Sequence, residues 1–277
     1  MLPVYNGEKT LPLAVASLIH QTYPHWKCYI VNDGSTDGTK AYLDSLTDDR
    51  FVIINFEKNK GRPYARQAAL DAAEGKYLAF LDADDFYHPE KLEKQVDEFK
   101  SNKELALVSC IMASFDSKQT LQSTRPYNGF QDPKLYNYRN DFSPSRAGSM
   151  VFLSEAKKVG YDLGLKYAQD TDFFERYLHE RKYNVINEIL YYYSEFESVT
   201  GRKIIQTYNY KRKRIIKKIK LYPFKVTLDL FIWFFKYIAV IIYVFVGLEK
   251  KLIEKRGSKP IAEDMLIFNN LLNTLNK

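Results

Sequence analysis

Three carboxylates follow a short apolar run in the sequence Asp82-Ala83-Asp84-Asp85, directly after Tyr77–Leu81. Carboxylates this close repel one another and lose hydration when buried, so they are tolerated mainly where a cation offsets their charge. A hard divalent ion such as Mg²⁺ or Mn²⁺ takes one or two carboxylates and completes its coordination with phosphate oxygens and water. The cluster therefore predicts a metal site, with an acidic cap on the next helix as the alternative.

A further acidic position, Asp33, follows the apolar run Trp26–Val31 within the segment Asn32–Thr39. At the end of a strand, a carboxylate could accept a hydrogen bond from a nucleotide base or a ribose hydroxyl, while Ser35 or Thr36 caps the helix that follows. The same residues could equally form a turn. Asp33 is therefore a candidate for nucleotide binding.

Basic residues follow the next apolar run, in Asn59-Lys60-Gly61-Arg62, and Arg66 lies one helical turn further on. Positive side chains beside the N-terminus of a helix are suited to a diphosphate. A solvated basic face is nearly as compatible with this pattern. Arg62 and Arg66 are candidates for binding a diphosphate.

The framework that positions these residues is an alternation of strands and helices. The 277 residues suit one large α/β domain or a domain plus an appendage. Strands separated by helices of this length predict parallel βαβ units with helices on both faces of the sheet, and ligands bind at the carboxyl ends of such strands. The expected strands are Trp26–Val31, Phe51–Phe56, Tyr77–Leu81, Leu105–Met112, Gly148–Leu153, Tyr183–Ile186 and Ile189–Tyr193, and the expected helices are Glu8–Gln21, Thr36–Leu46, Arg62–Glu74, Pro89–Lys100 and Asp170–Glu180.

Two stretches depart from this alternation. Met1–Tyr5 resembles the end of a strand whose beginning is missing, which predicts a truncated and weakened first strand. Lys118–Ser145 is rich in Pro, Asn, Gln, Tyr and Asp, and a long loop of this kind is usually functional or disordered. No secretory signal opens the chain, so the catalytic face is expected in the cytoplasm.

The spaced motifs together resemble the family 2 glycosyltransferases, inverting enzymes with the GT-A fold. The resemblance covers about residues 2 to 200, and five motifs occur in the order typical of that family. They are Leu2-Pro3-Val4-Tyr5-Asn6-Gly7-Glu8, Gln21-Thr22-Tyr23-Pro24, Val31 through Thr39, Asn59-Lys60-Gly61 with Ala65-Arg66, and Gly75-Lys76-Tyr77 through Asp85.

The resemblance implies a role for each donor-side residue. Asp33 would bind the nucleotide base, Asp82 the ribose side of the donor, and Asp84 the Mn²⁺ or Mg²⁺ that bridges the donor diphosphate. The residues that would lie against the nucleotide are Pro3, Tyr5 and Glu8.

The family's catalytic base comes from an acidic pair that opens a helix behind the acceptor site. Gln169-Asp170-Thr171-Asp172 fits that place, so Asp170 is the expected base, with Asp172 as a competitor and an acidic helix cap as a third interpretation. Such a carboxylate would take the proton of an acceptor hydroxyl as it attacks the anomeric carbon.

Two departures from the family pattern restrict the prediction. The Gln-x-x-Arg-Trp signature of processive synthases is absent, which favours transfer of a single sugar. The Arg-x-His of many relatives is also absent from Ser194–Glu197. Contacts that select the sugar and the acceptor are expected in the Lys118–Arg146 loop, whose sequence does not identify them.

Charge is concentrated in the last quarter of the chain. The net charge is +7, yet residues 202 to 256 carry 15 Lys and Arg against three acidic residues, so this segment is +12 and the remainder is −5. Within it, Leu230–Leu248 has one charge, Lys236, and as a helix would be about 28 Å long. We expect a GT-A domain over residues 1–200 and a basic, hydrophobic helical region over residues 201–277. This region would lie on an anionic membrane surface or span the membrane once, with a buried or oligomer-forming helix as the alternative.

The sequence thus predicts an inverting, metal-dependent transferase of single sugars from a nucleotide-diphospho-sugar to a hydroxyl of a glycan or lipid-linked acceptor. It would act at the cytoplasmic side of the cell membrane in surface polysaccharide biosynthesis. A catalytically impaired scaffold is the alternative. A nucleotidyltransferase would need a glycine-rich phosphate loop, which is absent, and the apolar core of the tail argues against nucleic acid as a partner.

Overall fold

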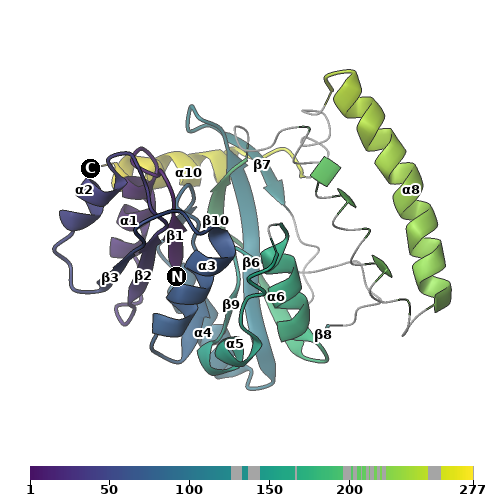
Figure 1. Cartoon of the computed structure of the whole chain (residues 1–277). Coiled ribbons are helices and arrows are strands. Elements are labelled where there is room, and N and C mark those ends of the chain that lie inside the picture. The colour runs from purple at the N-terminus through teal and green to yellow at the C-terminus, as the bar shows by residue number, and fades with distance from the viewer. Residues whose placement is uncertain are drawn as a thin grey trace.

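The expected alternation of strands and helices is present in a computed structural model of the chain, with helices on both faces of a central sheet (Figure 1). The structure describes residues 1–125, 133–136, 144–165, 167–195, 201, 205–206, 208–209, 212, 215–216, 219, 223–248 and 257–276. Much of the expected specificity loop and of the basic flanks of the tail lies outside these residues.

Ten strands and eight helices are described within these ranges. The strands are β1 (Leu2–Val4), β2 (Cys28–Asn32), β3 (Phe51–Asn55), β4 (Tyr77–Ala79), β5 (Phe86–Tyr87), β6 (Leu105–Phe115), β7 (Leu121–Arg125), β8 (Lys134–Leu135), β9 (Met150–Phe152) and β10 (Lys182–Ser194). The helices are α1 (Leu11–Ile19), α2 (Thr39–Asp44), α3 (Arg62–Ala72), α4 (Lys91–Ser101), α5 (Leu153–Val159), α6 (Gln169–Leu178), α8 (Pro223–Phe245) and α10 (Ala262–Leu275).

Strand β2 shows why helices cover both faces of the sheet. All five of its residues are buried, and successive side chains point to opposite faces. Cys28 and Ile30 pack in the core formed with α1, α2 and α4, whereas Tyr29 and Val31 pack in the core formed with α3, α5 and α6. A strand that is buried on both sides has a continuous apolar sequence, as in the run Trp26–Val31.

The parallel part of the sheet is built by the first three strands, in the order β1, β2, β3. Strand β1 has three residues, of which Leu2 and Val4 are buried. The Met1 amine donates to the Ala79 carbonyl at 2.8 Å, and the Leu81 amide donates to the Met1 carbonyl at 3.1 Å. These two bonds place β1 beside β4 and join the parallel strands to the rest of the sheet.

The second part of the sheet differs from the expected parallel order. Its strands follow the order β4, β9, β6, β10, β5, and only β6 and β10 are parallel neighbours. Strand β9 lies between β4 and β6 and runs antiparallel to both, so these two strands are not neighbours. The alternation of strands and helices does not reveal this, because β9 comes from a segment that follows the long polar stretch.

Part of the expected loop at Lys118–Ser145 is also strand. β7 pairs antiparallel with the end of β6, which runs to Phe115 rather than Met112. A tight turn joins them, in which the Asp116 side chain accepts from the amides of Lys118 and Thr120. The prediction of a loop over residues 121–125 was wrong because a polar strand can be held by its ladder alone.

Among the described residues after position 200, helices α8 and α10 differ in their surroundings (Figure 1). Helix α8 lies apart from the sheet, whereas α10 packs on β5, β6 and β10. Phe268 is fully buried at the centre of that contact, with its ring 5.9 Å from Phe86 and 5.3 Å from Tyr192 between centroids. The last helix therefore completes the core of the domain that the sequence placed within residues 1–200.

A charged side chain is buried behind β6. Lys91, at the start of α4, is fully inaccessible, and its Nζ donates to Gln95 Oε1 at 2.7 Å and lies 4.1 Å from the centroid of the Tyr87 ring. Gln95 in turn donates to the carbonyls of Val108 and Gly148. Burial lowers the pKa of Lys91 to about 8.

Replacing the buried lysine should stabilise the protein near neutral pH. Lys91→Met keeps an unbranched apolar stem and removes a charge that folding must desolvate. The folded-state pKa lies below the unfolded value of about 10.4, so the native protein gains stability as pH rises through the window from about 8 to about 10. We expect the variant to be more stable by about 1–3 kcal/mol near pH 7 and the difference to shrink near pH 10 in urea unfolding. Lys100→Met, on the exposed end of the same helix, is the control.

Removing the ring at the centre of the α10 contact should destabilise the whole domain. We expect Phe268→Ala to cost about 3–5 kcal/mol in the free energy of unfolding, because a large buried ring leaves a cavity. Ile267→Ala is the matched control, since that neighbour is 42% exposed. Equal effects in urea unfolding would contradict the packing of α10 on the sheet.

Candidate functional site

A cleft of about 660 Å³ opens where β1, β2 and β4 end. Seven of the eight predicted donor- and metal-side residues line it, although they come from four separate segments of the chain. They are Pro3, Tyr5, Asp33, Arg62, Arg66, Asp82 and Asp84. The exception is Glu8, which is not among the lining residues.

The loops that follow β1 and β2 hold each other by hydrogen bonds. The Asn6 amide donates to Ser35 Oγ at 2.9 Å, and the Thr36 amide donates to Asn6 Oδ1 at 2.8 Å. Glu8 belongs to this contact, because its carboxylate accepts from the Gly38 amide at 3.1 Å. In this structure, Glu8 therefore supports the wall of the cleft.

Asp33 joins the cleft to the start of α3. Its Oδ1 accepts from the Lys60 amide at 2.7 Å and its Oδ2 from the Gly61 amide at 2.9 Å. The next residue, Gly34, has φ +68°, and a Cβ there would lie 2.4 Å from the carbonyl carbon of Lys58. Only glycine permits this close approach of two backbones. The carboxylate is thus fixed at the cleft by backbone amides.

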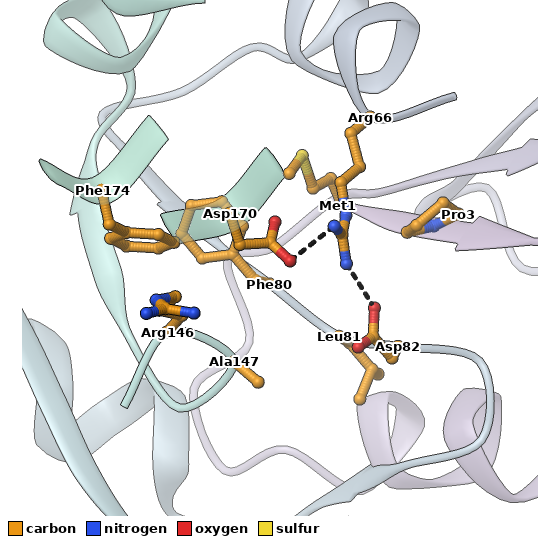
Figure 2. Close-up of a pocket in the computed structure, with 10 residues that line it drawn as sticks. All are labelled: Met1, Pro3, Arg66, Phe80, Leu81, Asp82, Arg146, Ala147, Asp170 and Phe174. Atoms are coloured by element: carbon orange, nitrogen blue, oxygen red, sulfur yellow. Dashed lines mark hydrogen bonds and ion pairs between the residues drawn. The ribbon is translucent and has the colours of Figure 1, made fainter. Parts of the chain in front are cut away.

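Arg66 connects the donor side of the site to the predicted base (Figure 2). Its Nη2 lies 3.0 Å from Asp82 Oδ1 and its Nη1 lies 2.6 Å from Asp170 Oδ2. The Arg66 side chain is 9% exposed. Burial alone would lower the pKa of Arg66, but the carboxylates of Asp170 and Asp82 outweigh burial and raise it above the usual value. The guanidinium therefore remains a cation between two carboxylates.

A small pocket of about 30 Å³ surrounds this ion-pair triad (Figure 2). Phe80 and Phe174 form its apolar wall, and Arg146 brings a second basic residue to its lining. Arg66 and Asp82 also line the larger cleft. The two spaces are therefore adjacent, and the predicted base lies next to the predicted donor site.

The structure separates the two candidates for the base. Asp170 is the second residue of α6 and lines the pocket. Asp172 pairs instead with Arg176 at 2.8 Å, and Arg176 also donates to the Val159 carbonyl. Asp172 is absent from the lining of both spaces. Geometry favours Asp170.

The third carboxylate of the acidic cluster has a structural position. Asp85 is 5% exposed, and it accepts from the Tyr191 hydroxyl at 2.7 Å and from the Ser194 amide at 2.9 Å. Burial raises its pKa well above the usual range, and the charges of Asp84 and Asp82 raise it further. Asp85 thus ties the acidic loop to the end of β10.

The carboxylates at Asp82 and Asp84 suit a divalent cation that also binds a phosphate. In the described part of the chain, no group of three His, Cys, Asp or Glu side chains lies close enough to hold a metal by itself. Mg²⁺ typically takes only one or two carboxylates and fills its other positions with substrate oxygens and water. Asp82 and Asp84 both line the cleft, and the negative charge that perturbs Asp85 is what such a cation would offset.

Two tyrosines that the sequence did not single out contact the site or the helix that supports it. The Tyr191 hydroxyl accepts from the Asp82 amide at 3.3 Å, and the Tyr161 ring stacks on Phe173 of α6 at 4.6 Å. Nothing in the sequence around these tyrosines distinguishes them from the other aromatic core residues.

Comparisons with known proteins agree with this architecture. The family model described as glycosyl transferase family 2 matches residues 1–159. The putative teichuronic acid biosynthesis glycosyltransferase TuaG of Bacillus subtilis is 32% identical over 57% of this chain and 62% of its own length. An uncharacterized glycosyltransferase of Methanocaldococcus jannaschii is 30% identical over 81% of this chain and 76% of its own length.

A third relative, the UDP-Glc:alpha-D-GlcNAc-diphosphoundecaprenol beta-1,3-glucosyltransferase WfgD of Escherichia coli, is 35% identical over 37% of this chain and 40% of its own length. The chain thus matches about 40 to 60% of the length of WfgD and TuaG.

Among solved structures, S. aureus TarS in complex with UDP superposes with a TM-score of 0.61 at 22% identity, covering 78% of this chain and 64% of that chain. This likeness confirms the predicted GT-A fold. The family model matches more than half of the chain, which shows that the chain belongs to glycosyl transferase family 2.

Proposed function

We propose that the protein transfers a single sugar from a nucleotide-diphospho-sugar to a hydroxyl group, with inversion at the anomeric carbon. The observation that carries the proposal is the shared ion pair of Arg66 with Asp82 and Asp170. It holds a donor-side carboxylate and a candidate base around one cation, at the boundary of a cleft large enough for a nucleotide. A single displacement needs donor and base in this proximity.

Donor binding would use the residues at the strand ends. Asp33 would accept a hydrogen bond from the base, Asp82 would face the ribose, and Pro3 and Tyr5 would lie against the nucleotide. TarS has been crystallised with UDP and with UDP-GlcNAc, and the name of WfgD specifies UDP-glucose, so a uridine nucleotide is the first donor to test. Asp84 would hold Mn²⁺ or Mg²⁺, which when bound stabilises negative charge on the diphosphate.

The chain's own residues would perform the proton transfer and part of the charge stabilisation. Asp170 accepts the proton of the acceptor hydroxyl as its oxygen attacks the anomeric carbon from the side opposite the nucleotide. The bond from that carbon to the diphosphate oxygen breaks in the same step. Arg62 and Arg66 stabilise the charge of the departing diphosphate. In this structure, Nη1 and Nη2 of Arg66 both contact carboxylates. When the nucleotide-sugar binds, the guanidinium must therefore share its N–H groups between these carboxylates and the diphosphate.

The acceptor would be a glycan or a lipid-linked saccharide of surface polysaccharide biosynthesis, at the cytoplasmic side of the cell membrane. Two relatives support this class by name, since TuaG is assigned to teichuronic acid biosynthesis and WfgD acts on a diphosphoundecaprenol carrier. In the described residues, α8 is long and apolar enough to cross a membrane by length and composition. Attachment to a membrane that carries anionic lipid belongs to this proposal.

Neutralising the proposed base should remove catalysis and leave donor binding intact. We expect Asp170→Asn to lower kcat/KM by about 10²–10⁴-fold, the range of a lost general base. Asp172→Asn is the control, because that carboxylate lies on the same helix and pairs with Arg176. Transfer is measured with UDP-sugars and a lipid-linked acceptor, and UDP binding by thermal shift. Equal losses in the two variants would exclude Asp170 as the base.

Removing the proposed metal ligand should abolish cation-assisted nucleotide binding. With UDP and MnCl₂ present, the native protein should gain thermal stability, because a ligand that binds only the folded state raises its melting temperature. Asp84→Asn should lose the part of this gain that depends on Mn²⁺. Asp49→Asn is the control, since Asp49 is exposed and precedes β3 at the opposite edge of the sheet. If no nucleoside diphosphate among UDP, GDP, CDP and dTDP stabilises the native protein with Mn²⁺, the proposal fails.

A further inference from the structure

The chain leaves the catalytic domain for α8 and returns to it at the same edge. It departs after β10, where Tyr193 and Ser194 line the cleft. It returns at Ser258, which exchanges two backbone hydrogen bonds with Thr124 of β7, at 2.9 and 2.8 Å. We call the departure after β10 and the return at Ser258 the two tethers of α8. They are close together, because Arg125, next to Thr124, pairs with Glu195 at 2.7 Å.

The return is anchored by more than one bridge. Beyond Ser258, α10 buries Phe268, Leu271, Leu272 and Leu275 against the sheet. Both ends of the segment that contains α8 are therefore attached to one folded body. Whatever α8 contacts, its two ends must remain within reach of the same face of the domain.

This connectivity is incompatible with a single membrane span. A span would place the ends of α8 on opposite sides of a hydrocarbon core about 30 Å thick. The chain would then have to cross again between Phe245 and Ser258 to reach β7. That stretch contains Glu249, Lys250, Lys251, Glu254, Lys255 and Arg256, and charges at the centre of a membrane cost several kcal/mol each. The segment before α8 is equally unsuited, with nine Lys and Arg from residue 202 to 220.

The surface of α8 is one-sided. Val226, Trp233 and Val240 lie seven residues apart on one face and are buried. On that side, the Trp233 indole donates to the Tyr208 carbonyl at 2.8 Å. Asp229, Lys236 and Tyr243 are also seven residues apart, so they lie on one side of the helix and give it a polar flank.

The opposite face of α8 is apolar and exposed. Its large side chains form a continuous stripe along the whole helix, and Phe224 and Phe245 at the two ends are each 92% exposed. The members of this stripe are Phe224, Leu228, Phe231, Phe234, Phe235, Ile238, Ile241, Ile242 and Phe245. An apolar stripe with a polar flank is typical of a helix that lies in the membrane interface.

We propose that α8 lies in the plane of the membrane as a monotopic anchor, with this stripe in the lipid and both tethers on the cytoplasmic side. The proposal rests on the membrane attachment proposed above and specifies its geometry. Lipid fits better than a second copy of the chain, because residues 202–256 carry a net charge of +12. That charge repels another copy and attracts anionic headgroups. The first tether leaves next to Tyr193 and Ser194, which line the cleft, and the second returns close to it, so the anchor holds the site beside the lipid surface.

Cysteine labelling of the full chain tests the topology. Cys28 and Cys110 are buried, so the native chain gives a low background. Ile219→Cys lies before α8 and Lys259→Cys lies after it, and both positions are exposed. In sealed vesicles with the cytoplasmic face outward, a membrane-impermeant maleimide should label both variants. Labelling of only one of them, or recovery of the protein in the soluble fraction, would overturn the proposal.

A pair of charge variants tests the face that meets the lipid. Phe235→Glu should weaken sedimentation with vesicles of phosphatidylglycerol and phosphatidylcholine by about tenfold or more, because it places a charge in the apolar stripe. Leu135→Glu on β8 is matched, since Leu135 is 57% exposed and Phe235 is 55% exposed. Equal vesicle binding by both variants would contradict the proposed face. UDP thermal shifts on the same proteins report donor binding separately, so a failed anchor and a failed donor site give different results.

Discussion

The site depends on how negative charge is neutralised at the carboxyl edge of the sheet. Asp33, Asp82, Asp85 and Asp170 approach this edge from the ends of β2 and β4 and from the start of α6, and they are held in three different ways. Backbone amides hold Asp33, a tyrosine hydroxyl and an amide hold Asp85, and the guanidinium of Arg66 holds Asp82 and Asp170. Without these partners, the carboxylates would repel one another and the loops that carry them would separate. Arg66 has a structural role and a proposed functional one. It joins α3 to α6 through Asp170, and it lines the cleft where the proposed diphosphate would need a cation.

The convergence of the predicted donor-side residues on one cleft could be predicted from sequence, because their positions follow local rules. Asp33, Asp82 and Asp84 follow within a few residues of an apolar run, Arg62 opens the helix after the next run, and the ends of neighbouring strands converge. The ion pair of Arg66 with Asp170 could not be predicted in this way, since the two residues are 104 positions apart and meet only when α3 and α6 pack on the same face. Glu8 shows the opposite case: its motif was recognised, but its side chain supports the neighbouring loop at Gly38 and does not line the cleft.

Errors in the predicted fold have a common physical origin. Strand β9 enters between β4 and β6, and β7 pairs with β6, because ladders satisfy the backbone whatever the side chains are. Periodicity sees only side chains, so a short or polar strand such as Leu121–Arg125 carries no signal. Helix α10 was assigned to the tail by charge and position, whereas its apolar residues match a gap on β5, β6 and β10 that only the assembled sheet presents.

The return of the chain at Ser258 has a practical consequence for making a form of the protein that lacks α8. Ending the polypeptide near residue 200 would discard α10 together with α8 and would leave Phe86 and Tyr192 without the Phe268 ring that covers them. An internal deletion avoids this loss, because Glu195 and Ser258 contact neighbouring residues of β7. Glu195 pairs with Arg125, and Ser258 pairs with Thr124. A short glycine-serine linker between Glu195 and Ser258 would replace the apolar, basic segment that contains α8. It would keep every helix that packs on the sheet.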